Sequence, residues 1–216
     1  MTDLEISKII LKEFNEKTLA MTSQYLEIHE PVYENEQLRI DRIDREKNDD
    51  TLIAYLPVKN EYFFFAVYLN KKTGEIFSIG TESRNLVSVI FASENMTGEE
   101  LKSLTKLNCQ ESWSKGDKIP KKKATYTFSG IEFYPNPEPD EFEDKLDKLL
   151  TFIEADREGI LLISKKSKGY IHVLMDFHYG NQLLGAMSIE AETLKRISSL
   201  NLSMDFQITA WGNGFR

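Results

Sequence analysis

Four side chains of this chain could act as a nucleophile, a general base or a transition-metal ligand: Cys109, His29, His172 and His178. A cysteine nucleophile needs a base beside it and a group that orients the base, and no familiar signature surrounds Cys109 in "LNCQESW". We therefore interpret Cys109 as a small apolar residue at a helix end, because unpaired cysteine is commonly buried. It is the only cysteine, which excludes an internal disulfide and predicts a reducing, cytoplasmic setting.

Two of the histidines lie on one predicted strand, "YIHVLMDFH", and invite a metal interpretation. Alternation places His172, Asp176 and His178 on the same face of that strand. At about 3.3 Å per residue, His172 and His178 are roughly 20 Å apart and cannot share one ion. Asp176 and His178, about 7 Å apart, could flank a small site. Two ligands with no third do not form a closed zinc site, so we interpret this face as polar or interfacial and expect no metal ion.

The segment "NCQESWSKGDKIPKKK" concentrates lysines around a Gly-Asp pair and could attract an anion. The chain contains neither G-x-G-x-x-G nor G-x-x-x-x-G-K-[ST], so this segment is not a nucleotide-binding loop. Gly-Asp is typical of a turn, and solvated lysines need no ligand, so we favour an exposed turn. The carboxylates of "EPDEFEDKLDK" suit the start of a helix, where the macrodipole stabilises negative charge. We expect no catalytic residues and no cofactor.

Elements of two kinds must position these residues. In the first part, "TDLEISKIILKEF" predicts a helix that begins with a capping box of Thr2 and Glu5. From Tyr25 to Phe77 the pattern becomes that of strands, with a hairpin turn at Asn70 to Gly74; the strands are "LRIDRI", "TLIAYLPV", "EYFFFAVYL" and "GEIFSIG". The first part therefore has the order α-β-β-β-β.

The second part begins where "GTESRN", Gly80 to Asn85, interrupts the strand pattern. Its predicted helices are one capped by Thr97 and Glu100 with leucines at 101, 104 and 107, and two with apolar stripes at 142–153 and 194–200. Its predicted strands are "LVSVIFA", "KATYTFSGIEF", "ILLIS", "YIHVLMDF", "LLGAMSI" and "MDFQITAW". We expect an α+β fold with antiparallel-rich sheets, helices packed on one face, and two α+β units at residues 1–82 and 83–216.

Charge is concentrated in the first unit. The chain has 27 basic and 35 acidic residues, a net charge of −8, which argues against nucleic acid or an anionic membrane as partner and permits a basic protein. Residues 1–82 hold 10 basic and 16 acidic residues, a net charge of −6. No apolar run reaches the roughly 20 residues of a membrane span, and the start does not resemble a signal peptide.

Acidic residues are densest between Glu27 and Asp50, where nine acids face four bases. One interpretation is a solvated face, since surface charge commonly serves solubility. The other is a patch that binds a basic partner. On the second interpretation, we expect Glu34, Glu36, Asp41 and Asp44 on or near one exposed surface.

The second part resembles the bacterial family called domain of unknown function 4279, over about residues 84–211. The resemblance rests on the order "LVSVIFASENMTGEELKSLTKLNCQESWSKGDKI", "EFEDKLDKLLTFIEADREGI", "YIHVLMDFH" and "GAMSIEAETLKRISSLNLSMDFQI". Its most characteristic part is a loop after an aromatic position, which Trp113, Lys115, Gly116 and Asp117 match. After that loop the chain has lysines and "TYTFSG", where the family pattern has a further aromatic residue or arginine.

This resemblance implies a bacterial cytoplasmic protein without an established reaction, similar to immunity proteins found beside polymorphic toxins. We therefore expect a non-catalytic binding protein, an immunity protein that neutralises a basic toxin domain by stoichiometric binding. The alternative is a small-molecule sensor or enzyme, with Trp113, Lys115, Asp176 and His178 around a pocket. The sequence does not define an oligomeric state.

Overall fold

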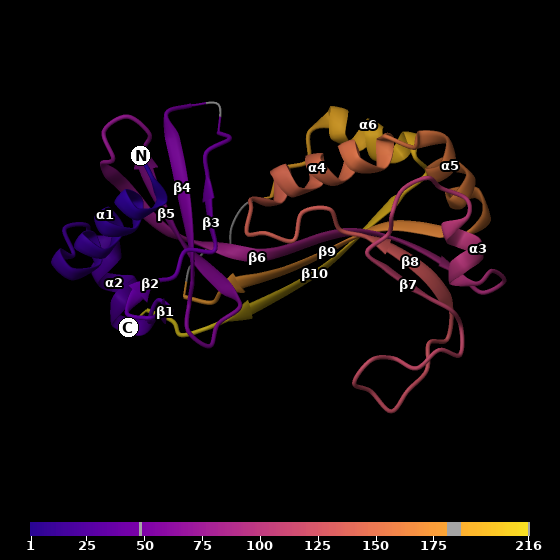
Figure 1. Ribbon diagram of the computed structural model, residues 1–216, viewed down its shortest axis with the longest axis horizontal. Helices are drawn as coiled ribbons and strands as arrows, with labels where there is room; N and C mark the ends of the chain where they lie inside the picture. The colour runs from indigo at the N-terminus through magenta and orange to yellow at the C-terminus, as the bar shows by residue number, and fades with distance from the viewer. Residues whose placement is uncertain (48, 181–186, 216) are drawn as a thin grey trace.

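The computed structural model describes residues 1–47, 49–180 and 187–215, which form six helices and ten strands (Figure 1). The helices are α1 (Asp3–Glu16), α2 (Ala20–Ile28), α3 (Gly98–Lys102), α4 (Phe142–Glu154), α5 (Arg157–Lys166) and α6 (Ala191–Ser199). The strands are β1 (Tyr33–Glu34), β2 (Gln37–Leu38), β3 (Arg42–Asp44), β4 (Thr51–Pro57), β5 (Phe63–Asn70), β6 (Ile76–Ser93), β7 (Glu111–Trp113), β8 (Ser129–Phe133), β9 (Lys168–His178) and β10 (Ser203–Trp211). The fold is α+β, as the sequence predicts.

One eight-stranded sheet runs through the molecule in the order β10-β9-β6-β5-β4-β3, and β8 joins the far half of β6 and also pairs with β7. Every pairing is antiparallel except that of β9 with β10, which are parallel and are connected through α6. The strands β1 and β2 form a separate small hairpin. Figure 1 shows α4, α5 and α6 over one face of the β6-β9-β10 part, and α1 and α2 at the opposite end of the molecule.

Two apolar clusters make up most of the core. The N-terminal cluster joins α1 to strands β4, β5 and the start of β6, from Ile6 to Ile79. The C-terminal cluster joins the other half of β6 to β8, β9 and helices α4 to α6, from Val87 to Leu202. The two clusters lie on either side of residues 80–86.

The expected interruption at Gly80 to Asn85 is wrong, because these residues lie inside β6, an unbroken strand of 18 residues. The first half of β6 pairs with β5, as far as Ser83 with Phe63. The second half pairs with β9, beginning at Arg84 with Asp176. Polar residues on this strand therefore mark a change of neighbours and not a break in the strand.

Some of the predicted helices, strands and caps are confirmed, and others are wrong. Both capping boxes are present, at Thr2 with Glu5 and at Thr97 with Glu100. The "ILLIS" segment is helical, because Asp156 caps α5 and the apolar residues Ile160 and Ile163 share a buried face. The chain from Tyr25 to Ile28 is also helical, as the end of α2. Two boundaries differ as well: α3 ends at 102, and β8 covers only residues 129–133 of the strand expected from 123. In the expected strand "LLGAMSI", residues 187–189 are not in a strand, and the others lie outside the described residues.

A polar seam joins the two units. Arg42 on β3 contacts the fully buried Asp140 before α4, with Nη1 to Oδ1 at 2.6 Å. Lys47 forms ion pairs with Glu141 and with Asp144, the latter at 2.6 Å. These contacts fix the N-terminal sheet against the start of α4. Among the described residues no helix is both long and apolar enough to cross a membrane.

Candidate functional site

The acidic hairpin, residues 33–38, is an exposed element that carries two of the four predicted partner-binding residues, Glu34 and Glu36. Its strands pair at Tyr33 with Leu38 and at Glu34 with Gln37. Asn35 and Glu36 form the tip, with φ of 51° and 65°. Positive φ is unusual for glutamate and typical of a tight two-residue hairpin turn, so the turn holds the Glu36 backbone in a defined place.

The hairpin is fixed at its base. Backbone hydrogen bonds run from Val32 N to Pro57 O and from Arg39 N to Val32 O, both 3.0 Å long. Leu38 is 6% exposed and belongs to the N-terminal apolar cluster. In contrast, Tyr33 is 49% exposed. The hairpin therefore presents an aromatic ring and carboxylates on an anchored support.

Arg39 partly neutralises the predicted acidic set. It contacts Asp41 Oδ1 at 2.5 Å and Glu34 Oε1 at 2.9 Å. Glu36 forms no ion pair with any described residue. The expectation that Asp44 is exposed is wrong: its side chain is 1% exposed, because it faces Arg42 and Lys47 in the polar seam. Three of the four predicted residues thus share one surface.

Further acidic residues continue this surface toward the end of α2. Glu27, Glu30 and Glu61 line hollows between α2, the hairpin and β5, with Lys59 among them. One hollow, of about 490 Å³, includes Tyr33. Lys59 pairs with Glu30 at 2.7 Å. With the hairpin residues, this gives six acids (27, 30, 34, 36, 41 and 61) against two bases (39 and 59), a local net charge of −4.

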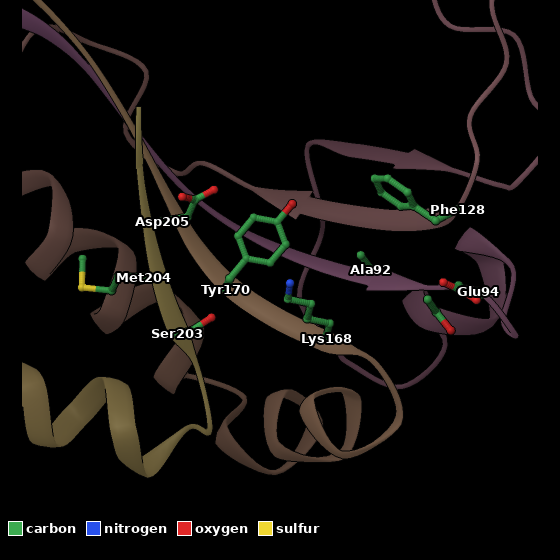
Figure 2. Close-up of a pocket in the computed structure, with 9 residues that line it drawn as sticks. Ala92, Glu94, Phe128, Lys168, Tyr170, Ser203, Met204 and Asp205 are labelled. Carbon is green, nitrogen blue, oxygen red and sulfur yellow. The ribbon is translucent and has the colours of Figure 1, made fainter. Parts of the chain in front are cut away.

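One hollow on the C-terminal unit lies at the far end of the sheet, on the face away from α4 to α6. It measures about 640 Å³ and is formed by the ends of β6, β9 and β10. Figure 2 shows Asp205 and Glu94 at opposite sides of this hollow, with Tyr170 and Lys168 between them and Phe128 on the side of Glu94. The Lys168 ammonium lies 5.9 Å from the centre of the Tyr170 ring. Two carboxylates, one ammonium and two aromatic rings make it a polar, aromatic-walled hollow.

A polar row crosses the same sheet face beside this hollow. Ser88 on β6 is opposite His172 on β9, which is opposite Asp205 on β10. His172 Nδ1 lies 3.8 Å from Asp205 Oδ2. Ser88 is fully buried, and its Oγ forms no hydrogen bond of normal geometry with any described residue. Burial raises the pKa of nearby Glu132, opposed in part by the Ser88 hydroxyl and by His172.

His29 and His178 meet where the two units touch, a contact that the sequence reasoning missed. Their Nε2 atoms are 2.9 Å apart, and His178 Nε2 lies 2.8 Å from the carbonyl oxygen of Asn213. Both side chains are buried. Burial, and secondly the charge of His178, lowers the pKa of His29 to about 4, so His29 is neutral at pH 7.

The alternative pocket residues do not come together. Trp113 lies in a row of cross-strand neighbours that runs across the sheet to the start of β9. It is opposite Gly130, which is opposite Ala92, which is opposite Lys168. Asp176 lies eight residues further along β9, about 26 Å away at 3.3 Å per residue. Asp176 instead binds Arg84 at 2.6 Å.

Cys109 and the carboxylate cluster of the seam have structural environments. Burial raises the pKa of the Cys109 thiol, the opposite of what activates a nucleophile. Asp44, Asp140 and Asp144 offer oxygens within 4.8 Å of one another. Cationic side chains from 42, 47 and 148 already bind these carboxylates, so the seam needs no metal ion to balance its charge.

Comparison with known proteins identifies the family. A family model described as "Domain of unknown function (DUF4279)" matches residues 81–211, more than half of the chain. The chain belongs to the DUF4279 family. Neither the curated proteins nor the solved structures include a match to the chain.

The loop that marks the DUF4279 resemblance is built as a turn. Asp117 Oδ2 accepts a hydrogen bond from Ser114 N at 2.7 Å, and Gly116 adopts a φ of 94°. Trp113 lies over Gly130, where a Cβ atom would come within 2.4 Å of the indole. Lys115 donates its backbone N–H to Ser129 Oγ at 2.9 Å. The side chain and backbone geometry at these four positions thus hold β7, the turn and β8 together.

The candidate sites divide between the DUF4279 region and the rest of the chain. The 640 Å³ hollow and the polar row lie inside the matched region, whereas the acidic hairpin lies before it. His29 also precedes the region, and its partner His178 lies within it. The signal that could have revealed the row is the alternation of "YIHVLMDFH" combined with the strand register, which the sequence alone does not supply.

Proposed function

We propose that this protein is a non-catalytic bacterial binding protein of the immunity type, which neutralises a cognate toxin in the cytoplasm by stoichiometric binding. The observation that carries the proposal is the acidic hairpin: Glu36 at the tip forms no ion pair with any described residue, and the exposed Tyr33 lies on the same hairpin. Tyrosine is enriched among residues that dominate binding energy, and an acidic surround selects and steers a basic partner.

The surrounding charge supports a basic partner. A local net charge of −4 raises the encounter rate with a positively charged surface and lowers it with nucleic acid. The anchored base of the hairpin reduces the entropy that binding would otherwise lose, because the contact residues are already ordered. Arg39 keeps two of the carboxylates in place, leaving Glu36 for the partner.

Co-expression with the product of the adjacent gene tests the proposal. We expect rescue of growth and a 1:1 complex whose association slows as salt increases. Charge reversal by Glu36→Lys together with Glu34→Lys should lower the association rate about tenfold at low salt, with a smaller effect on dissociation. Glu75→Lys is the matched control, since Glu75 is an exposed acid of the same unit outside the hairpin surface. A non-toxic neighbour that forms no complex, or equal effects of the hairpin and control variants, would refute the proposal.

The 640 Å³ hollow supports a second candidate function, a small-molecule sensor or enzyme. Carboxylates of Glu94 and Asp205 beside the rings of Tyr170 and Phe128 suit a small polar ligand with a cationic group, since aromatic faces and carboxylates both attract cations. Native mass spectrometry of the purified protein tests it. A bound metabolite that is lost in Tyr170→Ala would favour this function, and ligand-free protein that still rescues growth would rule it out.

A further inference from the structure

The contact between His29 and His178 brings together three groups with lone pairs in a buried place. His29 follows α2 as its C-terminal cap, His178 ends β9, and Asn213 follows β10. The two Nε2 atoms are 2.9 Å apart, and the Asn213 carbonyl oxygen is 2.8 Å from His178 Nε2. The side chains are 6% and 1% exposed, so bulk water does not compete for them.

One hydrogen shared among His29 Nε2, His178 Nε2 and the Asn213 carbonyl oxygen does not give each pair of atoms a good hydrogen bond. If His178 Nε2 carries hydrogen, it must serve both the Asn213 oxygen and His29 Nε2. If His29 Nε2 carries it, the lone pair of His178 faces the carbonyl oxygen at 2.8 Å, which is repulsive. A cation between the three groups would meet a favourable lone pair from each.

The distances fit a metal ion. Metal-to-imidazole bonds are about 2.0–2.1 Å long, so an ion bonded to two nitrogens 2.9 Å apart would have an N–metal–N angle of about 90°. This is the angle between neighbouring ligands in octahedral or square-planar coordination. A tetrahedral ion would require the nitrogens to separate to about 3.3 Å, a small movement at the end of two side chains.

The surroundings place a carboxylate near one ring. Glu61 Oε1 lies 3.9 Å from His29 Nδ1, the ring nitrogen that points away from His178. This is longer than a hydrogen bond, so the carboxylate would have to approach by about 1 Å to orient a metal-bound imidazole. Two glycines leave room for the rings: a Cβ atom would come within 2.5 Å of His178 at Gly180 and within 2.9 Å of His29 at Gly212.

We propose that His29 Nε2, His178 Nε2 and the Asn213 carbonyl form a binding site for a divalent transition-metal ion that favours imidazole, such as Zn²⁺, Ni²⁺ or Co²⁺. The ion would link α2 of the N-terminal unit to β9 and to the end of β10. None of the three ligands lies on the acidic hairpin, and the histidine variants leave the surface carboxylates unchanged, so the metal site stands or fails separately from the proposed toxin binding. The proposal also departs from the expectation of no metal ion. That expectation considered His172, and not His29, as the second histidine ligand beside His178.

The test uses the full-length, untagged protein after removal of metal with a chelator. Titration with Co²⁺ should give one equivalent of binding with a visible absorption band, and Zn²⁺ should compete for it. His29→Gln and His178→Gln should each abolish the band. His172→Gln, a control that removes a histidine outside the site, should leave it unchanged. Zn²⁺ should raise the melting temperature of the wild type and of the control, because a ligand that binds only the native state stabilises it.

A second variant keeps the test informative if the histidine variants fold poorly. Glu61 is near His29 Nδ1 but is not a proposed metal ligand. Glu61→Gln should weaken Co²⁺ binding about 10- to 100-fold. Wild type that binds less than a tenth of an equivalent of Co²⁺ and of Zn²⁺ at tens of micromolar would overturn the proposal. Binding that survives in either folded histidine variant would overturn it too.

Discussion

Asp140 offers the sharpest test of the seam that joins the two units. Its side chain is fully buried, with Arg42 at 2.6 Å and Lys148 at 3.0 Å. Asp140→Asn keeps the volume and removes the charge, leaving the guanidinium of Arg42, only 10% exposed, with weaker compensation. Removing one partner of a buried ion pair costs about 3–5 kcal/mol. Because Asp44 still lies 3.6 Å from Arg42, we expect the lower end, about 3 kcal/mol.

Urea unfolding measures this loss. With a slope of about 2 kcal/mol/M, 3 kcal/mol lowers the midpoint by about 1.5 M. Arg42→Met and the double variant complete a cycle, and we expect the double variant to lose less than the sum of the single variants, since the two groups contact each other. A loss below about 1 kcal/mol, or strictly additive losses, would show that the pair does not couple the units.

The pH dependence of Asp140→Asn follows from the direction of its pKa shift. Burial alone would raise the pKa of Asp140, but hydrogen bonds and charges from Arg42 and Lys148 outweigh it and hold the pKa below its usual value. A lowered pKa in the folded state means that the stabilisation is complete above the unfolded pKa of about 4 and is lost as the pH falls below it. The difference between wild type and variant should therefore shrink in acid.

Three further predictions concern stability, each measured by urea unfolding. Gly130→Ala should cost about 1–3 kcal/mol, because the added Cβ atom meets the Trp113 indole at 2.4 Å, whereas at Gly80 the same change meets nothing within 4 Å; equal costs would contradict this. Burial, and secondly the charge of Glu141, raises the pKa of Glu82 to about 7. The wild type therefore loses stability as the pH rises from about 4.5 to 7. Glu82→Gln should be the more stable protein at pH 8 but not at pH 4. Burial lowers the pKa of Lys145 to about 8, so wild type should gain stability between pH 8 and about 10.5, and Lys145→Met should lack this gain.

Local signals in the sequence predicted the elements whose residues interact with near neighbours. Thr2 with Glu5 and Thr97 with Glu100 are capping boxes in which both hydrogen bonds lie within four residues. The turn at 70–74 is likewise local, with Gly74 N donating to Asn70 O at 2.9 Å. These features depend on spacing alone, and spacing is visible in the sequence.

The errors arise where distant contacts decide the structure. "ILLIS" has the composition of a strand, but the Asp156 cap and packing on the C-terminal cluster make it helical, because tertiary packing outweighs β propensity. The acid at 44 was expected at the surface with 34, 36 and 41, and only its contacts with Arg42 and Lys47 show that it is buried. Charge alone does not separate a buried, paired carboxylate from a solvated one.

The same reason explains why the candidate sites were only partly predicted. The acidic character of residues 33–38 could be found from composition, since charge is visible in the sequence. The row of Ser88, His172 and Asp205 depends on strand register, and the pair of His29 and His178 joins residues 149 positions apart. Register and long-range pairing follow from packing that no single segment encodes.

The continuous strand β6 connects the N-terminal and C-terminal parts of the sheet. The DUF4279 match begins at residue 81, inside this strand, so residues 76–80 precede the match while belonging to the same strand. A rotation of one unit against the other would have to break that strand, the ion pairs of Arg42 and Lys47, and the contact between His29 and His178. The units should therefore move as one body, and the acidic hairpin keeps a fixed orientation relative to the domain. A partner that binds the hairpin consequently meets a preorganised surface, for which electrostatic steering speeds encounter without a later cost in ordering the two units.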